Sequence, residues 1–375
     1  MQHTTRIREG TMRLVSTSML RQDMVLARSV YHKDCLILKA GQRDIGRFVH
    51  NLHNMGIEYV YIEDNKSDGI VIPDAISEKT RVKCKKVLRA TIKEFAKRST
   101  LEVEGLVDSV DSIINDILYN KDVQVSLNDI STTDDYTFSH SVSTTVYSLL
   151  LAKELGYSRS MLQKLAVGTM LHDMGKVLLD KEVLFKKDQL TPEEFEYIKQ
   201  HTVLGYQALK RCIGITELSR IVSLTHHERM DGSGYPRAVK AGNLHDFARI
   251  VAIADVYDAL TTDRCYRKKW SNERAVNYLI EYSGSKFDTN LVGRFIQQIA
   301  IYPNGSMVRL SDMTYGVVVR QNRSMPLRPV VRVVSDKYGN DVDIYEIDLM
   351  KELSITIIQS EIEIQDSKSR FEMDK

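Results

Sequence analysis

The sequence predicts a mainly α-helical protein with a small α+β domain at its N-terminal end and a short β-rich segment at its C-terminal end. Two observations support this fold class. Residues 126–302 contain successive segments with apolar residues three and four apart, which is the spacing of amphipathic helices. Short β-type runs separated by polar turns lie on both sides of that block.

Residues 1–64 are predicted to form the small α+β domain, whose regulatory or docking role the residues leave open. The stretch DMVLARSVYHKDCLILKAG contains two short β-type runs around a polar turn at 32–34. The apolar residues that follow, at 45, 48, 49 and 52, have helical spacing. EYVYI then has the composition of a further strand.

Residues 65–125 are predicted to be a helical linker that begins with a hinge at 65–73, where glycine and proline interrupt KSDGIVIPD. RVKCKKVLRATIKEFAKR is basic on most faces and carries a narrow apolar stripe of Val82, Val87, Leu88, Ile92 and Phe95. Such a helix suits a solvated linker or a dimer contact, and its basic face leaves phosphate binding open.

Within 126–302, two amphipathic helices precede the first polar motif, and the second is predicted to continue through His172. Their apolar positions are Val142, Val146, Leu149, Leu150, Leu162, Leu165, Ala166 and Met170. In 303–375, the runs VRL, GVVVR, PVVRVV and DIYEI are separated by turn residues and predict a small sheet. A polar tail follows from about residue 365.

Composition argues against several classes of protein. A net charge of +2 gives no global attraction to a nucleic acid polymer or a membrane surface. No apolar run is long enough for a membrane-spanning helix, and the first residues lack the apolar stretch of a secretory signal. Cys35, Cys84, Cys212 and Cys265 form no C-x-x-C pair, which predicts reduced thiols in a cytoplasmic protein.

Five of the ten histidines lie between residues 140 and 227. On the predicted helix, His172 and Asp173 are about 100° apart, and Lys176 follows on the same face. The preceding apolar run indicates burial, and a buried His-Asp-Lys set needs compensation of the kind that metal ions supply. The string HHERMDGSGYP is rarer than an HD pair: adjacent imidazoles at a helix end can both reach a metal, and glycines allow close backbone approach.

These motifs resemble those of the HD-GYP family, bacterial signalling phosphodiesterases of the HD phosphohydrolase superfamily. The shared elements, in family order, are HD-x-GK, a histidine with glycine four residues later (His201 and Gly205), HHE-x-x-DG-x-GYP and ADVYDALTTDRCYR. The resemblance covers about residues 126–302 and implies that they form an HD-type helical bundle as the catalytic domain.

The resemblance implies a binuclear metal site. The ligands implied for the first metal are His140, His172, Asp173 and Asp255; those for the second are Asp173 as a bridge, His201, His226 and His227. Asp258 is expected to orient a ligand. Donors of only nitrogen and oxygen favour two divalent ions, iron or manganese. Some family members recruit a third metal with a glutamate at the position that Tyr136 occupies here, so two metals are predicted.

The resemblance also implies residues around a substrate. Asp173 and Lys176 are the expected catalytic residues, with Lys176 steadying charge on the phosphate or on the attacking hydroxide. Arg264 and Arg267 correspond to basic residues that hold substrate phosphates; an exposed helix end with ordinary charges is the alternative. Tyr235 is expected either to contact the substrate or to act as a packing anchor.

The implied activity is hydrolysis of cyclic di-GMP by a metal-bridging hydroxide, to pGpG, GMP or both. Two alternatives stay open: hydrolysis of another cyclic dinucleotide such as cyclic GMP-AMP, and a catalytically silent module that senses the nucleotide. Docking of diguanylate cyclase domains is a further implication of the resemblance, and a homodimer is left open by the basic helix.

Overall fold

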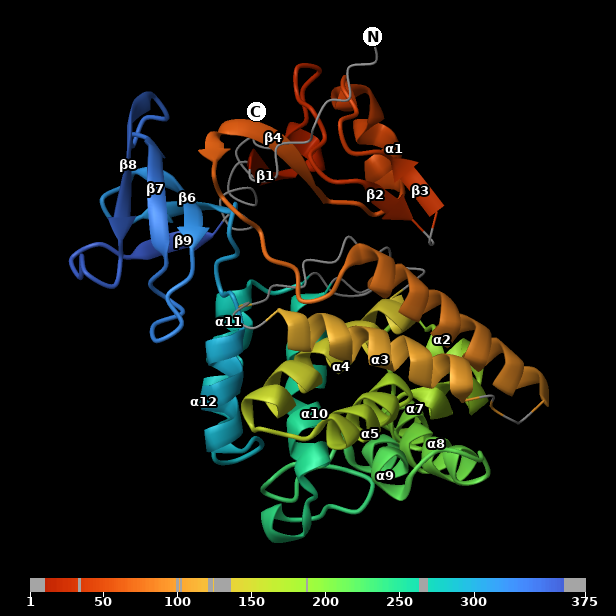
Figure 1. Ribbon diagram of the computed structural model, residues 1–375. Helices are drawn as coiled ribbons and strands as arrows, with labels where there is room; N and C mark the ends of the chain where they lie inside the picture. The colour runs from red at the N-terminus through yellow and green to blue at the C-terminus, as the bar shows by residue number, and fades with distance from the viewer. Residues whose placement is uncertain are drawn as a thin grey trace.

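The computed structural model describes residues 11–32, 35–98, 101, 103–120, 124, 136–186, 188–262 and 269–360. It confirms the predicted fold class: a mainly helical body is joined to a small α+β region and to a C-terminal antiparallel sheet (Figure 1). No helix in these ranges is both long enough and apolar enough to cross a membrane.

The N-terminal region is built from two antiparallel strand pairs, β1 with β4 and β2 with β3. Ile45 and Leu52, which the helical spacing singled out, lie in its apolar core with Leu26 and Val60. Strand β4 starts at the predicted EYVYI run but continues past residue 64 into the segment predicted as a hinge. The elements are β1 (Thr11–Ser16), η1 (Thr17–Met19), β2 (Val30–His32), β3 (Cys35–Leu38), η2 (Ile45–Phe48), α1 (Val49–Asn54) and β4 (Tyr59–Asp68).

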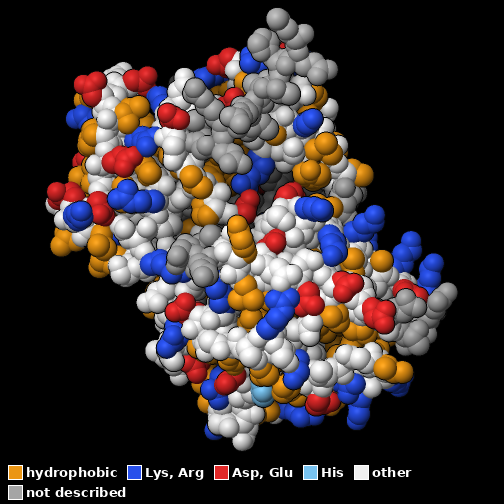
Figure 2. All heavy atoms as spheres, in the orientation of Figure 1, with side chains coloured by type: hydrophobic (Ala, Val, Ile, Leu, Met, Phe, Trp, Pro, Cys, Tyr) orange, Lys and Arg blue, Asp and Glu red, His pale blue; other side chains and the backbone are white. Residues whose placement is uncertain are grey.

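Two helices, α2 (Glu78–Arg98) and α3 (Glu104–Tyr119), occupy the predicted linker. Leu88 and Phe95 of the predicted apolar stripe are buried in the same continuous core as the helices that follow, so α2 packs onto the bundle along its length. The opposite face of α2 is basic, and lysine and arginine side chains gather over this helix in Figure 2. Its exposed lysines are Lys79, Lys83, Lys86, Lys93 and Lys97.

The bundle follows, with α4, α5, α9 and α10 at its centre and α11 and α12 beside them (Figure 1). Its helices are α4 (Tyr136–Glu154), α5 (Arg159–Met170), η4 (Met174–Leu178), α6 (Lys181–Leu184), α7 (Pro192–Lys199), α8 (His201–Lys210), α9 (Glu217–Thr225), η5 (Ala241–Asn243), α10 (Asp246–Thr261), α11 (Asn272–Glu281) and α12 (Thr289–Gln298).

The helix predicted to continue through His172 ends earlier. Helix α5 stops at Met170, His172 and Asp173 occupy a turn, and the 3₁₀ helix η4 starts at Met174. The prediction of one continuous helix through Lys176 is therefore wrong. The reason is tertiary: Gly175 in η4 packs directly against the backbone of α8, and this contact lies outside the local periodicity.

The C-terminal strands form a five-stranded antiparallel sheet in the order β8-β7-β6-β5-β9. Four of its strands coincide with the predicted β runs, whereas β9 was not predicted and pairs with β5. The strands are β5 (Met307–Leu310), β6 (Tyr315–Arg320), β7 (Val330–Ser335), β8 (Asp341–Asp348) and β9 (Ile357–Ser360). Arg332 of β7 donates to the carbonyl oxygen of Asp68 at 2.7 Å, so this sheet contacts the end of β4.

Candidate metal centre

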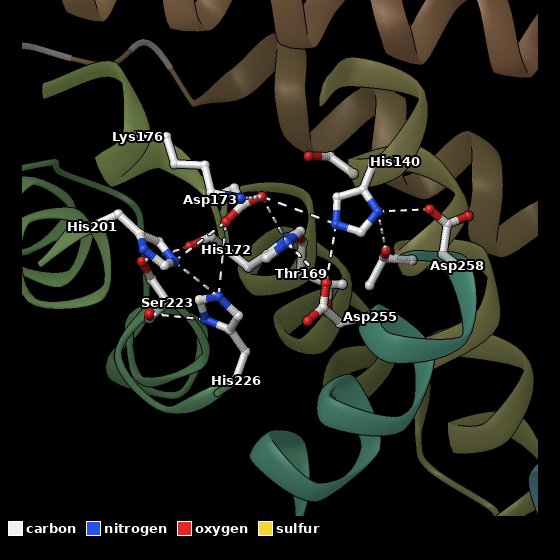
Figure 3. Close-up of polar contacts among 12 residues, drawn as sticks. His140, Thr169, His172, Asp173, Lys176, His201, Ser223, His226, Asp255 and Asp258 are labelled. Atoms are coloured by element: carbon white, nitrogen blue, oxygen red, sulfur yellow. Dashed lines mark hydrogen bonds and ion pairs between the residues drawn. The ribbon is translucent and has the colours of Figure 1, made fainter. Parts of the chain in front are cut away.

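The seven predicted metal ligands converge on one buried region inside the bundle. Figure 3 labels them with the exception of His227. Six of them are nearly or fully buried, and the side chain of His227 is 20% exposed. His140 comes from α4, His172 and Asp173 from the turn before η4, His201 from the start of α8, His226 and His227 from the end of α9, and Asp255 from α10.

Two glycines explain how α8 brings its histidine to Asp173. A methyl group on Gly175 would lie 2.6 Å from the backbone nitrogen of Gly205 and would collide with the carbonyl oxygen of His201. A methyl group on Gly205 would lie 3.0 Å from the nitrogen of Gly175 and would collide with the hydroxyl of Ser223. Because neither residue has a Cβ, the two backbones can touch, and Nε2 of His201 reaches to 3.5 Å from Oδ1 of Asp173.

His140 lies between two carboxylates of α10. Its Nε2 is 3.0 Å from Oδ1 of Asp255, and its Nδ1 is 2.6 Å from Oδ2 of Asp258. Burial disfavours the charged ring, but the hydrogen bonds to both aspartates outweigh burial and raise the pKa of His140 to about 9. Asp258 thus holds the ring from behind, as expected of a residue that orients a ligand.

Three other histidines are oriented by backbone carbonyl groups. Nδ1 of His172 donates to the Thr169 oxygen at 2.7 Å, Nδ1 of His201 to the Ile198 oxygen at 2.7 Å, and Nδ1 of His226 to the Ser223 oxygen at 3.0 Å. Because a carbonyl oxygen only accepts, the proton of each neutral ring lies on Nδ1. The lone pair on each Nε2 is then free for a metal ion.

The centre of this cluster contains buried polar atoms that a bound cation could pair with. Nε2 of His172 and Oδ1 of Asp173 are buried, and within the described ranges neither has a hydrogen-bond partner. The Nε2 atoms of His201 and His226 lie 3.3 Å apart, where two lone pairs repel each other. Three overlapping groups have their donor atoms within 4.8 Å of one another: His201 with His226 and His227, His140 with His172 and Asp255, and His172 with Asp173 and His226.

The electrostatics of the cluster suit metal binding. Burial raises the pKa of Asp173, but nearby Lys176 and His172 outweigh it and hold that pKa well below its ordinary value. Burial also raises the pKa of Asp255, but the hydrogen bond from His140 outweighs burial and holds that pKa well below its ordinary value. Burial lowers the pKa of His201 to about 4 and the pKa values of His226 and His227 well below the ordinary range. The ionised carboxylates therefore face neutral imidazoles at His201, His226 and His227, the protonation states that ligands require.

The remaining predicted residues have different positions. Nζ of Lys176 donates to Oδ2 of Asp173 at 2.6 Å, and the Lys176 side chain is 31% exposed. The ring of Tyr235 stacks on His227, with centroids 4.6 Å apart and planes at 30°. Arg264 and Arg267 lie outside the described residues. Tyr136 is the first residue of α4, but its side chain is not described, so the prediction of no third metal stays a prediction.

One buried residue beside the cluster was missed by the sequence analysis. Glu228 is 2% exposed, and its carboxylate accepts hydrogen bonds from the backbone nitrogens of Arg237 at 2.8 Å and Val239 at 3.0 Å. Its position directly after the paired histidines could have drawn attention to it. Its partners could not be found by spacing, because they are backbone groups on the far side of an irregular loop.

Two family models match the chain. A model described as an HD domain matches residues 124–291, and a model described as a KOW domain associated with HD domain matches residues 307–369, which include the C-terminal sheet.

Several curated proteins are similar to the chain. A cyclic di-GMP phosphodiesterase of Pseudomonas aeruginosa is 35% identical over 226 residues, which cover 60% of this chain and 54% of that protein. A cyclic di-GMP phosphodiesterase of Thermotoga maritima is 38% identical over 148 residues, covering 39% of this chain and 40% of that protein. A 3'3'-cGAMP-specific phosphodiesterase of Vibrio cholerae is 34% identical over 152 residues, covering 40% of this chain and 35% of that protein.

The chain thus spans between about a third and about half of the length of these relatives. The matched region contains the whole described cluster, from His140 to Asp255. With HDMGK and HHERMDGSGYP inside the matched region, and with these relatives, residues 124–291 are an HD domain of the HD-GYP type.

Proposed function

We propose that this protein is a metal-dependent phosphodiesterase that hydrolyses cyclic di-GMP to pGpG, GMP or both. The observation that carries the proposal is the pair of buried, unpartnered atoms, Nε2 of His172 and Oδ1 of Asp173, at the centre of the His/Asp cluster. The cyclic di-GMP phosphodiesterases among the relatives support this choice of substrate.

Asp173 is proposed as the bridge between two divalent cations. Its Oδ1 lies 3.5 Å from Nε2 of His201 and 3.8 Å from that of His226, whereas its Oδ2 lies 3.4 Å from Nε2 of His172 and 4.0 Å from that of His140. Each oxygen therefore faces a different set of imidazoles. Asp255 completes the set around His140, and His227 completes the set around His201.

Two bound cations, for which iron or manganese are our candidates, would activate a water molecule and polarise the phosphoryl group, whose phosphorus atom the water attacks as the ester oxygen leaves. The protein holds the ligands in place, because each of four rings is fixed through its second nitrogen. Lys176 is proposed to stabilise negative charge on the substrate phosphate, since its ammonium group lies beside Asp173 and its side chain is partly exposed to solvent. Arg264, Arg267 and Tyr235 are proposed to contact the rest of the substrate.

Turnover of cyclic di-GMP by purified protein loaded with iron or manganese tests the proposal, with separation of pGpG from GMP. Asp173→Ala is expected to abolish turnover and to lower metal content. Asp343→Ala, an exposed carboxylate in the C-terminal sheet, is the matched control and should behave as wild type. Retained turnover in Asp173→Ala would exclude the proposed site. Tight binding of cyclic di-GMP without product would favour the silent sensing module.

A second substrate is favoured by one observation, the similarity to a 3'3'-cGAMP-specific phosphodiesterase. Assaying both dinucleotides side by side under the same metal load separates the two candidates. We also propose the division into 1–64, 65–125, 126–302 and 303–375, a cytoplasmic location, and diguanylate cyclase domains or a second copy of the chain as partners.

A further inference from the structure

His227 differs from the other four histidines of the cluster in how its ring is held. Within the described part of the chain, neither of its ring nitrogens has a hydrogen-bond partner, and Nδ1 lies 3.9 Å from Oδ2 of Asp255. Its main ring contact outside the histidines is the stacked ring of Tyr235. The orientation of this ligand therefore depends on where the loop places Tyr235.

That loop packs tightly against the segment that carries His227. The backbone nitrogen of Tyr235 donates to the carbonyl oxygen of His227 at 3.3 Å. A methyl group on Gly234 would lie 2.5 Å from Cα of Glu228 and would collide with the same carbonyl oxygen. Because Gly234 has no side chain, the loop can touch the backbone of the segment that carries His226 and His227.

Glu228 closes the loop from inside. Its two carboxylate oxygens accept from the backbone nitrogens of Arg237 and Val239, which follow Tyr235 by two and four residues. A buried carboxylate with two hydrogen bonds is a strong tether, because losing one would leave a buried polar group unsatisfied. The tether and the stack form one connection, from Glu228 through the loop to Tyr235 and then to His227.

We propose that Glu228 is a positioning residue for the second metal, acting on His227 through the ring of Tyr235. The inference rests on the proposed binuclear site. The Glu228 side chain is not itself among the proposed ligands and acts on His227 alone among them, so its loss should weaken one metal site and leave the other intact. Substitutions behind a ligand typically cost about 10- to 100-fold in metal affinity.

The test is a titration of metal-free protein with Mn²⁺, which gives the number of bound ions and the affinity of each. Glu228→Gln keeps the side-chain volume but retains only one acceptor oxygen. Tyr235→Ala removes the stack, and Tyr235→Phe keeps it. Glu104→Gln, an exposed glutamate at the start of α3, is the control for the charge change. Thermal unfolding of each metal-free variant accompanies the titration.

We expect two ions in wild type, Tyr235→Phe and Glu104→Gln. In Glu228→Gln and Tyr235→Ala, one ion should bind about 10- to 100-fold more weakly while the other is unchanged. Combining these two substitutions should add little, because they interrupt one connection. Two unchanged ions in Glu228→Gln, or an equal weakening of both, would overturn the inference and leave the binuclear proposal standing. Fewer than two ions in wild type would overturn both.

Discussion

The contact between Gly175 and α8 makes a sharp prediction for Gly175→Ala. The added methyl group would lie 2.6 Å from the nitrogen of Gly205 and 2.8 Å from the carbonyl carbon of His201, whereas ordinary contacts begin near 3.4 Å. The three nearest atoms all belong to the backbone, so no flexible side chain can move aside. Helix α8 would have to move away from η4, and forcing extra volume into packed structure typically costs about 1–3 kcal/mol.

The same displacement should separate His201 from Asp173, which carries a functional consequence beyond stability. We expect Gly175→Ala to lower the free energy of unfolding of the metal-free protein by about 1–3 kcal/mol. The affinity for the metal at His201 should fall as well. Urea denaturation followed by circular dichroism gives the first quantity, and Mn²⁺ titration gives the second.

Gly293→Ala is the matched control, because nothing lies within 4 Å of its added methyl group in α12. Alanine is favoured over glycine in a helix by up to about 1 kcal/mol, so this variant should be slightly more stable than wild type. The two glycine substitutions should therefore have opposite signs. If Gly175→Ala were as stable as wild type and bound Mn²⁺ equally well, the packing argument would be refuted.

Three further predictions concern the cluster. Asp258→Ala removes the partner of Nδ1 of His140, and breaking a buried charge pair should destabilise the metal-free protein by about 3–5 kcal/mol in urea denaturation; a change under 1 kcal/mol would contradict the assigned role. The metal-free protein should be most stable near pH 6.5. The stability linked to the lowered pKa of His201 is lost as pH falls from 6.5 toward 4, and the stability linked to the raised pKa of His140 is lost as pH rises from 6.5 through 9. Urea denaturation across pH 4–9 without a stability maximum would argue against these protonation states. Removing the metal with a chelator should destabilise the metal-loaded protein, since an ion present at about 100 times its dissociation constant adds about 2.7 kcal/mol to the free energy of unfolding. Calorimetric unfolding that is unchanged by the chelator would count against a metal site in the folded state.

The sequence alone was sufficient for the fold class and for the set of candidate ligands. Helical spacing of apolar residues is a local property, so the buried stripe of α4 and the apolar run of α5 could be predicted from the chain itself. The paired histidines followed by a glycine-rich turn correctly indicated a helix end, because α9 stops at Thr225. The motif order named seven residues that converge in the structure, although motif order contains no distances.

Local patterns failed where distant backbone decides the conformation. The helical pattern before His172 continues in the sequence, yet the chain turns there because Gly175 meets α8. Strand β9 was missed because its four residues become a strand through pairing with β5. Glu228 is a charged residue whose burial depends on two backbone nitrogens beyond an irregular loop.

The sequence by itself thus determined the fold class, most of the elements and which donor atoms are available. Only the tertiary structure decided how those donors meet: Asp258 behind His140, carbonyl oxygens behind three other rings, and the two oxygens of Asp173 toward two sets of imidazoles. The physical reason is that a ligand's orientation and protonation depend on its hydrogen-bond partner and its burial. Both are set by segments far apart in the chain, such as α4 and α10, which meet only when the bundle packs.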